Sequence, residues 1–172
     1  MLFRSENKVV FSVLTVNHPG VLLRVTGLFS RRGFNIDSIV ACKTQTPEFS
    51  RWTLVVTGDE ATFIQLNRQL LKMEDVLTVE VLEPDSCTCS ELLLLKLDTE
   101  KAGRSAVLRM AQTYGGRVLD IGEKTVTLEM TGRPGQVDHF LAQLEGFGIV
   151  EMARTGITAL ERGDGTIHTG DI

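Results

Sequence analysis

Two short stretches of the chain hold polar groups at a spacing that suits ligand binding, residues 16–22 (VNHPGVL) and 33–36 (GFNI). Gly20 stands near the predicted start of a helix, where unpaired N–H groups and a partial positive charge favour a carboxylate. Because Gly20 lacks a Cβ, a ligand can approach the backbone there. The Asn17 side chain beside it can both donate and accept hydrogen bonds. These features predict a carboxylate-binding site at the helix start.

Asn35 offers a second amide of the same kind, two residues after Gly33, where the helix is expected to stop. Apolar residues adjoin the two amides and supply the wall of a pocket: Val21, Leu22 and Ile36. Such a combination suits a small zwitterion with an aliphatic side chain. A purely structural interpretation stays open, because strand-Asn-x-Pro-Gly-helix is also a good turn and asparagine tolerates such turns.

The other reactive side chains form no catalytic or metal-binding pattern. The three histidines are scattered, and none is four residues from another as in an HExxH motif. Cys87 and Cys89 supply at most half of the four ligands of a structural zinc, and Cys42 is expected to be a small packing residue. We therefore expect no catalytic residue, no metal site and no enzyme activity.

Composition narrows the class of protein. The chain has 172 residues, of which 42% are hydrophobic and 23% charged, so we expect a folded protein of one large or two small domains. A net charge of -4 argues against nucleic acid as a partner. No signal-peptide pattern and no apolar run near the roughly 18 residues of a spanning helix occur, which predicts a cytoplasmic protein away from membranes.

The period of the apolar residues predicts the elements that position the two stretches. A first helix is predicted from Pro19 to Arg32 and a second helix within 59–73. With strands predicted at 9–16, 34–44, 50–58 and 75–83, the order of the elements is βαββαβ. The same order is predicted again, with strands at 91–98, 116–122, 124–132 and 148–156 and helices around Val107–Tyr114 and Val137–Phe147.

The two halves read as copies of one unit. Gly33 and Gly115 stand 82 residues apart in equivalent places. At the same offset, the counterparts of the two asparagines and of the helix-start glycine are Thr99, Arg117 and Ala102. The second copy keeps the fold pattern without these residues, which favours a specific role for them in the first copy.

We therefore predict an α+β fold of two ferredoxin-like βαββαβ units, each an antiparallel sheet with both helices on one face. The first domain is expected over residues 1–83, a linker over 84–90, the second domain over 91–163 and a flexible tail over 164–172.

The first strand poses a packing problem, because it is apolar on both sides. One side is expected to carry Val9, Phe11 and Val13, and the other Val10, Leu14 and Val16. The other domain or a second subunit must cover the second side, and we predict at least a homodimer.

The sequence resembles the small, regulatory subunit family of acetolactate synthase (acetohydroxyacid synthase), whose first half is an ACT domain. The similarity covers roughly residues 8–163. The segments that carry it are NHPGVLLRVTGLFSRRGFNIDSI, SRWTLVV, LLKMEDVLTV, LLLLKL, LRMAQTYGGRVLDI and VEMARTGITALERG.

The resemblance implies a protein without activity or cofactor of its own. It implies that the chain binds and stimulates a catalytic large subunit, which is expected to carry thiamine diphosphate, Mg and FAD, and that it confers feedback inhibition by valine or another branched-chain amino acid. It also implies that two ACT domains pair around the effector. Carried over by position, Asn17, Gly20 and Asn35 match effector-binding positions, and Val21, Leu22 and Ile36 adjoin them.

Three alternatives stay open. The chain could be an ACT protein that senses a different amino acid for another enzyme, although MARTG in the second half argues against that. It could be a small ferredoxin-like enzyme, which would need a nucleophile or catalytic arginine that the pattern does not show. It could also be a purely structural assembly subunit.

Overall fold

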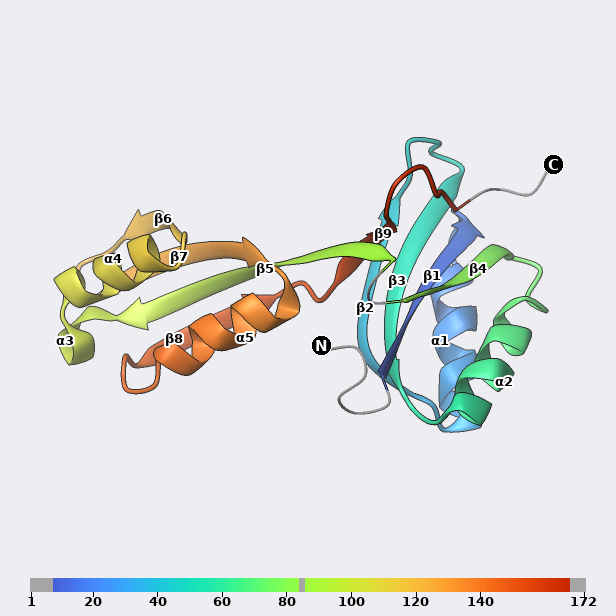
Figure 1. Ribbon diagram of the computed structural model, residues 1–172, viewed down its shortest axis with the longest axis horizontal. Helices are drawn as coiled ribbons and strands as arrows, with labels where there is room; N and C mark the ends of the chain where they lie inside the picture. The colour runs from blue at the N-terminus through green and yellow to red at the C-terminus, as the bar shows by residue number, and fades with distance from the viewer. Residues whose placement is uncertain (1–7, 84–85, 168–172) are drawn as a thin grey trace. The chain divides into compact units, whose positions relative to one another are not determined.

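The computed structural model describes residues 8–83 and 86–167 and divides the chain into two compact units (Figure 1). The first unit contains the described residues up to Cys89 and those from Ile157 onward, and the second unit is Ser90–Gly156. In the described residues, no helix is both long and apolar enough to cross a membrane.

The first unit is a four-stranded antiparallel sheet with both helices on one face (Figure 1). Its elements are β1 (Lys8–Val16), α1 (Val21–Arg32), β2 (Asn35–Lys43), β3 (Phe49–Thr57), α2 (Glu60–Leu70) and β4 (Val76–Leu82). The strand order β2-β3-β1-β4 is that of a split βαβ fold. This arrangement confirms the predicted ferredoxin-like unit.

Helix α1 is positioned by its two glycines. Gly20 caps its start with φ at 92°, and Gly33 caps its end with φ at 70° and donates to the carbonyls of Phe29 and Ser30. Both backbone angles lie in the left-handed region that glycine adopts without strain. The prediction that Pro19 opens the helix is wrong by two residues, because Gly20 leaves helical geometry and the helix begins at Val21.

The core between helices and sheet follows the predicted periodicity. Its fully buried side chains include Phe11, Val25, Phe29, Leu54 and Leu66. Val16 also packs against this core, whereas its place in the alternation predicted the opposite face. The pairing of β1 with β4 shifts register between Leu14 and Thr15, where β4 carries one extra residue, and this shift lets both Val76 and Val79 of β4 pack against the same core.

Part of the second face of this sheet is covered by the chain itself. Strand β9 (Thr158–Glu161), which the sequence pattern did not predict, pairs with β5 (Cys87–Asp98). Ala159 from β9 lies in a small apolar cluster with Val10, Val55, Leu82 and Cys87. The apolar second side of β1 therefore finds cover in a segment that was predicted to belong to the second domain.

The division of the chain thus differs from the predicted domains at both joints. The described residues from Ile157 belong to the first unit rather than to a domain ending at residue 163. Of the predicted linker, residues 86–90 are described, and from Cys87 they are already part of β5. Residues 168–172 of the predicted flexible tail lie outside the described chain.

The second unit repeats the architecture with strand order β6-β7-β5-β8. Its further elements are α3 (Thr99–Ala102), α4 (Arg104–Thr113), β6 (Arg117–Ile121), β7 (Thr125–Gly132), α5 (Pro134–Gln143) and β8 (Ile149–Arg154). The first helical segment is split at Gly103, where φ is 79°. The core is formed by residues such as Leu95, Val107, Leu128 and Phe140.

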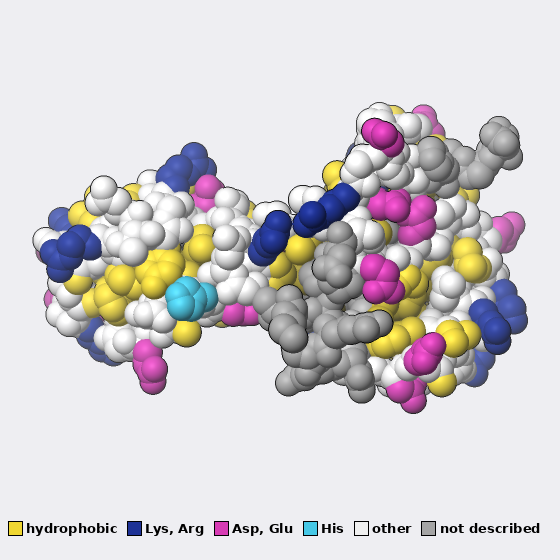
Figure 2. Space-filling model, viewed as in Figure 1, with side chains coloured by type: hydrophobic (Ala, Val, Ile, Leu, Met, Phe, Trp, Pro, Cys, Tyr) yellow, Lys and Arg dark blue, Asp and Glu magenta, His cyan; other side chains and the backbone are white. Residues whose placement is uncertain are grey.

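The sheet face away from the helices in this unit is largely polar, with ion pairs from Arg117 to Glu129 at 2.9 Å and from Lys96 to Glu151 at 3.4 Å. Exposed apolar side chains lie on the two edge strands, including Ile121 on β6 and Val150 on β8. Figure 2 shows hydrophobic side chains among polar ones at the surface of this unit.

Candidate functional site

Asn17 follows β1 and is fixed by the hairpin between β2 and β3. Its backbone N–H donates to the Glu48 carbonyl at 2.7 Å, and its Nδ2 donates to the Pro47 carbonyl at 2.8 Å. The residue is exposed. With Nδ2 engaged, the side chain presents its Oδ1 as an acceptor for a ligand.

Gly20 leaves the start of α1 accessible. In the described chain no side chain caps the first turn, and that turn contains no acidic residue. The free N–H groups and the positive end of the helix dipole are therefore available to an anion.

Arg24 lies one helical turn beyond Gly20, and the sequence interpretation missed its role in this region. A Cβ at Gly20 would lie 3.5 Å from Arg24 Nη1. Arg24 Nε donates to Asp75 Oδ2 at 2.5 Å, and His18 Nε2 lies 3.0 Å from Asp75 Oδ1. The spacing of four residues from Gly20 to Arg24 was the available signal, because it places both on one side of the helix.

His18, Arg24 and Asp75 line a cavity of about 640 Å³, together with Val16, Met73 and Glu74. The hydrogen bond from Arg24 is the main cause of a lowered pKa at Asp75, and burial opposes it only in part. The carboxylate is thus ionised near neutral pH and holds the guanidinium of Arg24 close to Gly20.

Asn35 begins β2 and is tied to a second carboxylate. Its Nδ2 donates to Asp37 Oδ1 at 2.8 Å, Thr57 Oγ1 donates to Asp37 Oδ2 at 2.7 Å, and Lys8 Nζ lies 3.3 Å from the same oxygen. Burial alone would raise the pKa of Asp37, but these donors and the Lys8 charge lower it. As at Asn17, the amide oxygen is the group left for a ligand.

The three predicted apolar neighbours differ in accessibility. Val21 is 2% exposed and packs in the core under the helix, so its backbone rather than its side chain is at the surface. Leu22 is 50% exposed, and Ile36 is half-buried against the core. Of the three, the Leu22 side chain is the one most open to a ligand or to a second chain.

One chain does not bring the two halves of the predicted site together. Val16, next to Asn17, pairs with Phe49 at one end of β3, whereas Asn35 pairs with Thr57 at the other end. Eight residues of strand separate the two ends, which is about 26 Å at 3.3 Å per residue. A single amino acid cannot span this distance.

The cysteines and other potential metal ligands form no metal-binding site in the part of the chain that the structure describes. No group of three or more His, Cys, Asp or Glu side chains there is placed to hold a metal ion. None of the three cysteines forms a disulfide within the described chain. Cys87 is buried, but Cys42 is exposed rather than packed as predicted, because it faces outward near the end of the edge strand β2.

Comparison with known proteins covers both units. Residues 11–78 match the model of the AHAS small subunit-like ACT domain, and residues 90–163 match the model of the small subunit of acetolactate synthase. A probable acetolactate synthase small subunit of Methanothermobacter thermautotrophicus is 40% identical over 159 residues, covering 92% of this chain and 95% of that protein. The chain belongs to the acetolactate synthase small subunit family.

Other members of the small subunit family agree with this assignment. The acetolactate synthase isozyme 3 small subunit of Escherichia coli is 38% identical over 156 residues, or 90% of this chain and 96% of that one. The crystal structure of the acetolactate synthase small subunit of Thermotoga maritima superposes with a TM-score of 0.85 at 31% identity, covering 91% of this chain and 98% of that chain. The predicted family and fold are confirmed.

Proposed function

We propose that this small subunit regulates an acetolactate synthase by binding a branched-chain amino acid, valine first among them, between the ACT units of two chains. It would stimulate the catalytic large subunit when the site is empty and withdraw that stimulation when the site is filled. The assembly is thus a homodimer or a higher oligomer joined to a catalytic partner.

The separation of Asn17 and Asn35 is the observation that carries this proposal. Both ends of the sheet present an amide with a free oxygen, yet about 26 Å of strand lies between them within one chain. Antiparallel pairing of two ACT units about a two-fold axis brings the Asn17 end of one chain against the Asn35 end of the other. Two equivalent sites would then form in each dimer.

The groups at the two ends suit complementary parts of an amino acid. The uncapped start of α1 at Gly20, with Arg24 nearby, suits a carboxylate. The Oδ1 atoms of Asn17 and Asn35 suit an ammonium group, because the Nδ2 of each is already engaged. The exposed Leu22 offers apolar contact to an aliphatic side chain.

Regulation follows from linkage between binding and subunit arrangement. A ligand that contacts both chains stabilises the arrangement in which its site is complete. If the catalytic subunit is stimulated by the other arrangement, the ligand inhibits, and the catalytic subunit in turn weakens ligand binding by the same factor.

On this proposal the small subunit is not an enzyme and holds no cofactor, and the catalytic partner carries thiamine diphosphate, Mg and FAD. Its three cysteines form no disulfide within the described chain, as is usual in a reducing compartment, and we place the protein in the cytoplasm.

Calorimetric titration of the protein with valine, leucine, isoleucine and lysine tests the proposal. We expect saturable binding of branched-chain amino acids, with one site per chain at the contact between ACT units, and no binding of lysine. Binding of a different amino acid class would point to another sensor, and no binding of any amino acid would point to a structural subunit. Acetolactate formation by the isolated chain would favour an enzyme instead, whereas stimulation of an added catalytic subunit would support regulation.

A further inference from the structure

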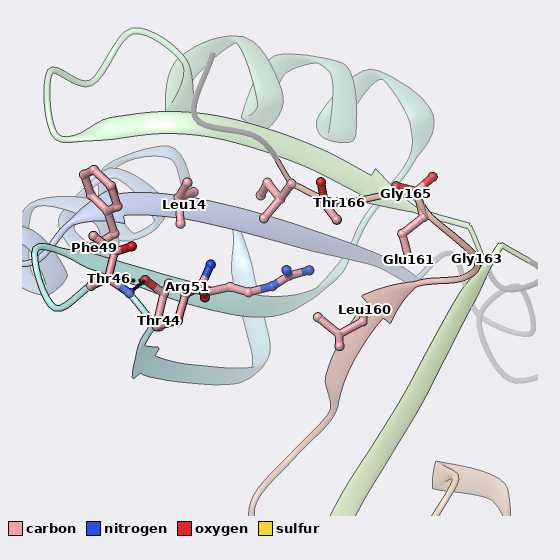
Figure 3. Close-up of a pocket in the computed structure, with 12 residues that line it drawn as sticks. Leu14, Thr44, Thr46, Phe49, Arg51, Leu160, Glu161, Gly163, Gly165 and Thr166 are labelled. Atoms are coloured by element: carbon pink, nitrogen blue, oxygen red, sulfur yellow. Dashed lines mark hydrogen bonds between the residues drawn. The ribbon is translucent and has the colours of Figure 1, made fainter. Parts of the chain in front are cut away.

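A separate cavity of about 580 Å³ lies in the first unit, on the sheet face that the helices do not cover (Figure 3). One wall is the hairpin between β2 and β3, and the other is β9 with the residues after it. The volume falls in the range of small-molecule sites. The lining combines hydroxyl, apolar and charged side chains, among them Thr46, Thr166, Leu14, Phe49, Arg51 and Glu161.

Arg51 provides a cation that the described chain does not neutralise by an ion pair. Its Nη2 donates to the Ala159 carbonyl at 3.2 Å, while its Nε is buried with no acceptor in the residues that the structure describes. No described carboxylate lies within 4.0 Å of the guanidinium. Half-burial lowers the pKa of Arg51, and the more distant charge of Glu80 opposes this effect only in part.

Glu161 provides the opposite charge in the same lining. Its carboxyl group packs against Gly165, where an added Cβ would come within 2.4 Å of it. Figure 3 shows the Arg51 side chain extended across the sheet toward the segment that carries Leu160 and Glu161. Although both charges line one cavity, they form no ion pair with each other, so each can meet the opposite end of a ligand.

We propose that this cavity binds a small zwitterionic amino acid with an apolar side chain. Arg51 receives the carboxylate, Glu161 receives the ammonium group, and Leu14 and Phe49 contact the side chain. A carboxylate on Arg51 offsets the cost of burying an unpaired cation. All lining residues belong to one unit of one chain, so the site is complete without a partner and does not rest on the proposed site between chains.

Leucine and two analogues test the recognition of each charged end. Methyl NMR of Leu14, Leu160 and Ile167 reports the cavity, in a chain that also carries Asn35→Ala so that the site between chains is disabled. We expect saturable shifts with L-leucine. Leucinamide lacks the carboxylate and 4-methylpentanoate lacks the ammonium group, and each is expected to bind at least about tenfold more weakly. Equal binding of leucinamide, or no saturable shift with leucine, would overturn the proposal.

Variants then test the two charged residues. Arg51→Met is expected to weaken leucine binding at least about tenfold, and Arg51→Lys is expected to weaken it less. As a control, Lys43→Met removes an exposed cation outside the cavity and should leave leucine binding unchanged. Fluorescence of Trp52, the single tryptophan, checks that the first unit stays folded. Because Arg51 also contacts Ala159, the exposed Glu161→Gln gives a second test: leucine should lose its advantage over 4-methylpentanoate, and a retained advantage would contradict the proposal.

Failure here and failure of the proposed function are distinguishable. Loss of leucine binding in Asn35→Ala with binding kept in Arg51→Met would reject this cavity and support the site between chains. The reverse pattern would reject the site between chains and support this cavity.

Discussion

Arg24 lies directly beside Gly20 at the start of α1, where a Cβ on the glycine would be 3.5 Å from the arginine Nη1. Asp75 fixes this relationship by accepting a hydrogen bond from Arg24 Nε at 2.5 Å. The helix start therefore combines free N–H groups with a nearby cation. A negatively charged side chain placed at position 20 would occupy the position that we assign to the carboxylate of the effector.

Gly20→Asp is therefore expected to abolish inhibition by valine while it spares stimulation of the catalytic subunit. The new carboxylate competes with the ligand for Arg24 and the helix N–H groups, and a residue with φ near 92° also strains the turn. Inhibition curves of the reconstituted complex measure the effect. Gly115→Asp, at a glycine with φ of 71° in the second unit, introduces similar strain and charge away from the site and should keep inhibition. Retained valine sensitivity in Gly20→Asp would contradict the assignment.

Asn35→Ala is expected to weaken valine binding by about 1–3 kcal/mol, through loss of a hydrogen bond to the ammonium group. Calorimetric titration measures the change in the free energy of valine binding directly. Since Asn35 also donates to Asp37, Thr57→Val is the matched control, because it removes another donor to Asp37 and leaves the amide in place. Similar losses in both variants would mean that Asp37, rather than the amide of Asn35, governs binding.

Mixing the two defective chains is expected to restore binding in part. A dimer of one Gly20→Asp chain and one Asn35→Ala chain contains one site with both halves intact and one with both halves defective. Equal mixing should yield about half mixed dimers, and hence valine sites amounting to about a quarter of the wild-type number. Calorimetry after joint refolding gives the number of sites, with Arg51→Met in every chain so that the proposed cavity beside β9 does not contribute. If no sites are recovered although mixed dimers form, the site does not span two chains.

Ionised Asp75 is expected to stabilise the first unit, and this contribution is expected to depend on pH. The pKa of Asp75 lies below its ordinary 3.8, mainly because of the hydrogen bond from Arg24. A lowered pKa in the folded state means that the ionised carboxylate stabilises the fold above pH 3.8, and that this contribution is lost as pH falls through the lowered pKa. Asp75→Asn should thus lower the free energy of unfolding at pH 7, with the difference from wild type shrinking below pH 3.8. Trp52 fluorescence during urea unfolding measures the free energy of unfolding of both proteins. A difference between them that is independent of pH would contradict the prediction.

In the second unit, Arg154 is expected to matter more for stability than an exposed cation. It pairs with Glu91, whose side chain is 2% exposed, and with Asp138 at 2.7 Å. Arg154→Ala leaves the buried carboxylate unpaired and should cost about 3 kcal/mol. Lys96→Ala breaks the exposed pair with Glu151 and should cost below about 1 kcal/mol. The near-ultraviolet signal of Tyr114, the single tyrosine, reports unfolding of this unit, and equal costs for the two variants would contradict the prediction.

The long elements could be predicted from the sequence because they repeat their apolar residues over two or more turns or strand pairs. Strand β9 could not be, since one of its four residues, Ala159, is buried and the others are exposed. The pairing of Arg24 with Asp75 could not be predicted either, because the two residues are 51 positions apart in the chain. Neither feature leaves a local pattern.

The sequence by itself determined the family, the two βαββαβ units and the two asparagines, since residue types and their spacing are local properties. Tertiary structure alone decided that Asn17 and Asn35 lie at opposite ends of β3, that Asp75 holds Arg24 by a hydrogen bond, and that the segment after Ile157 covers part of the second face of the first sheet. These facts depend on strand order and on contacts between distant residues. Such contacts form only when the packed chain brings together residues that the sequence keeps apart.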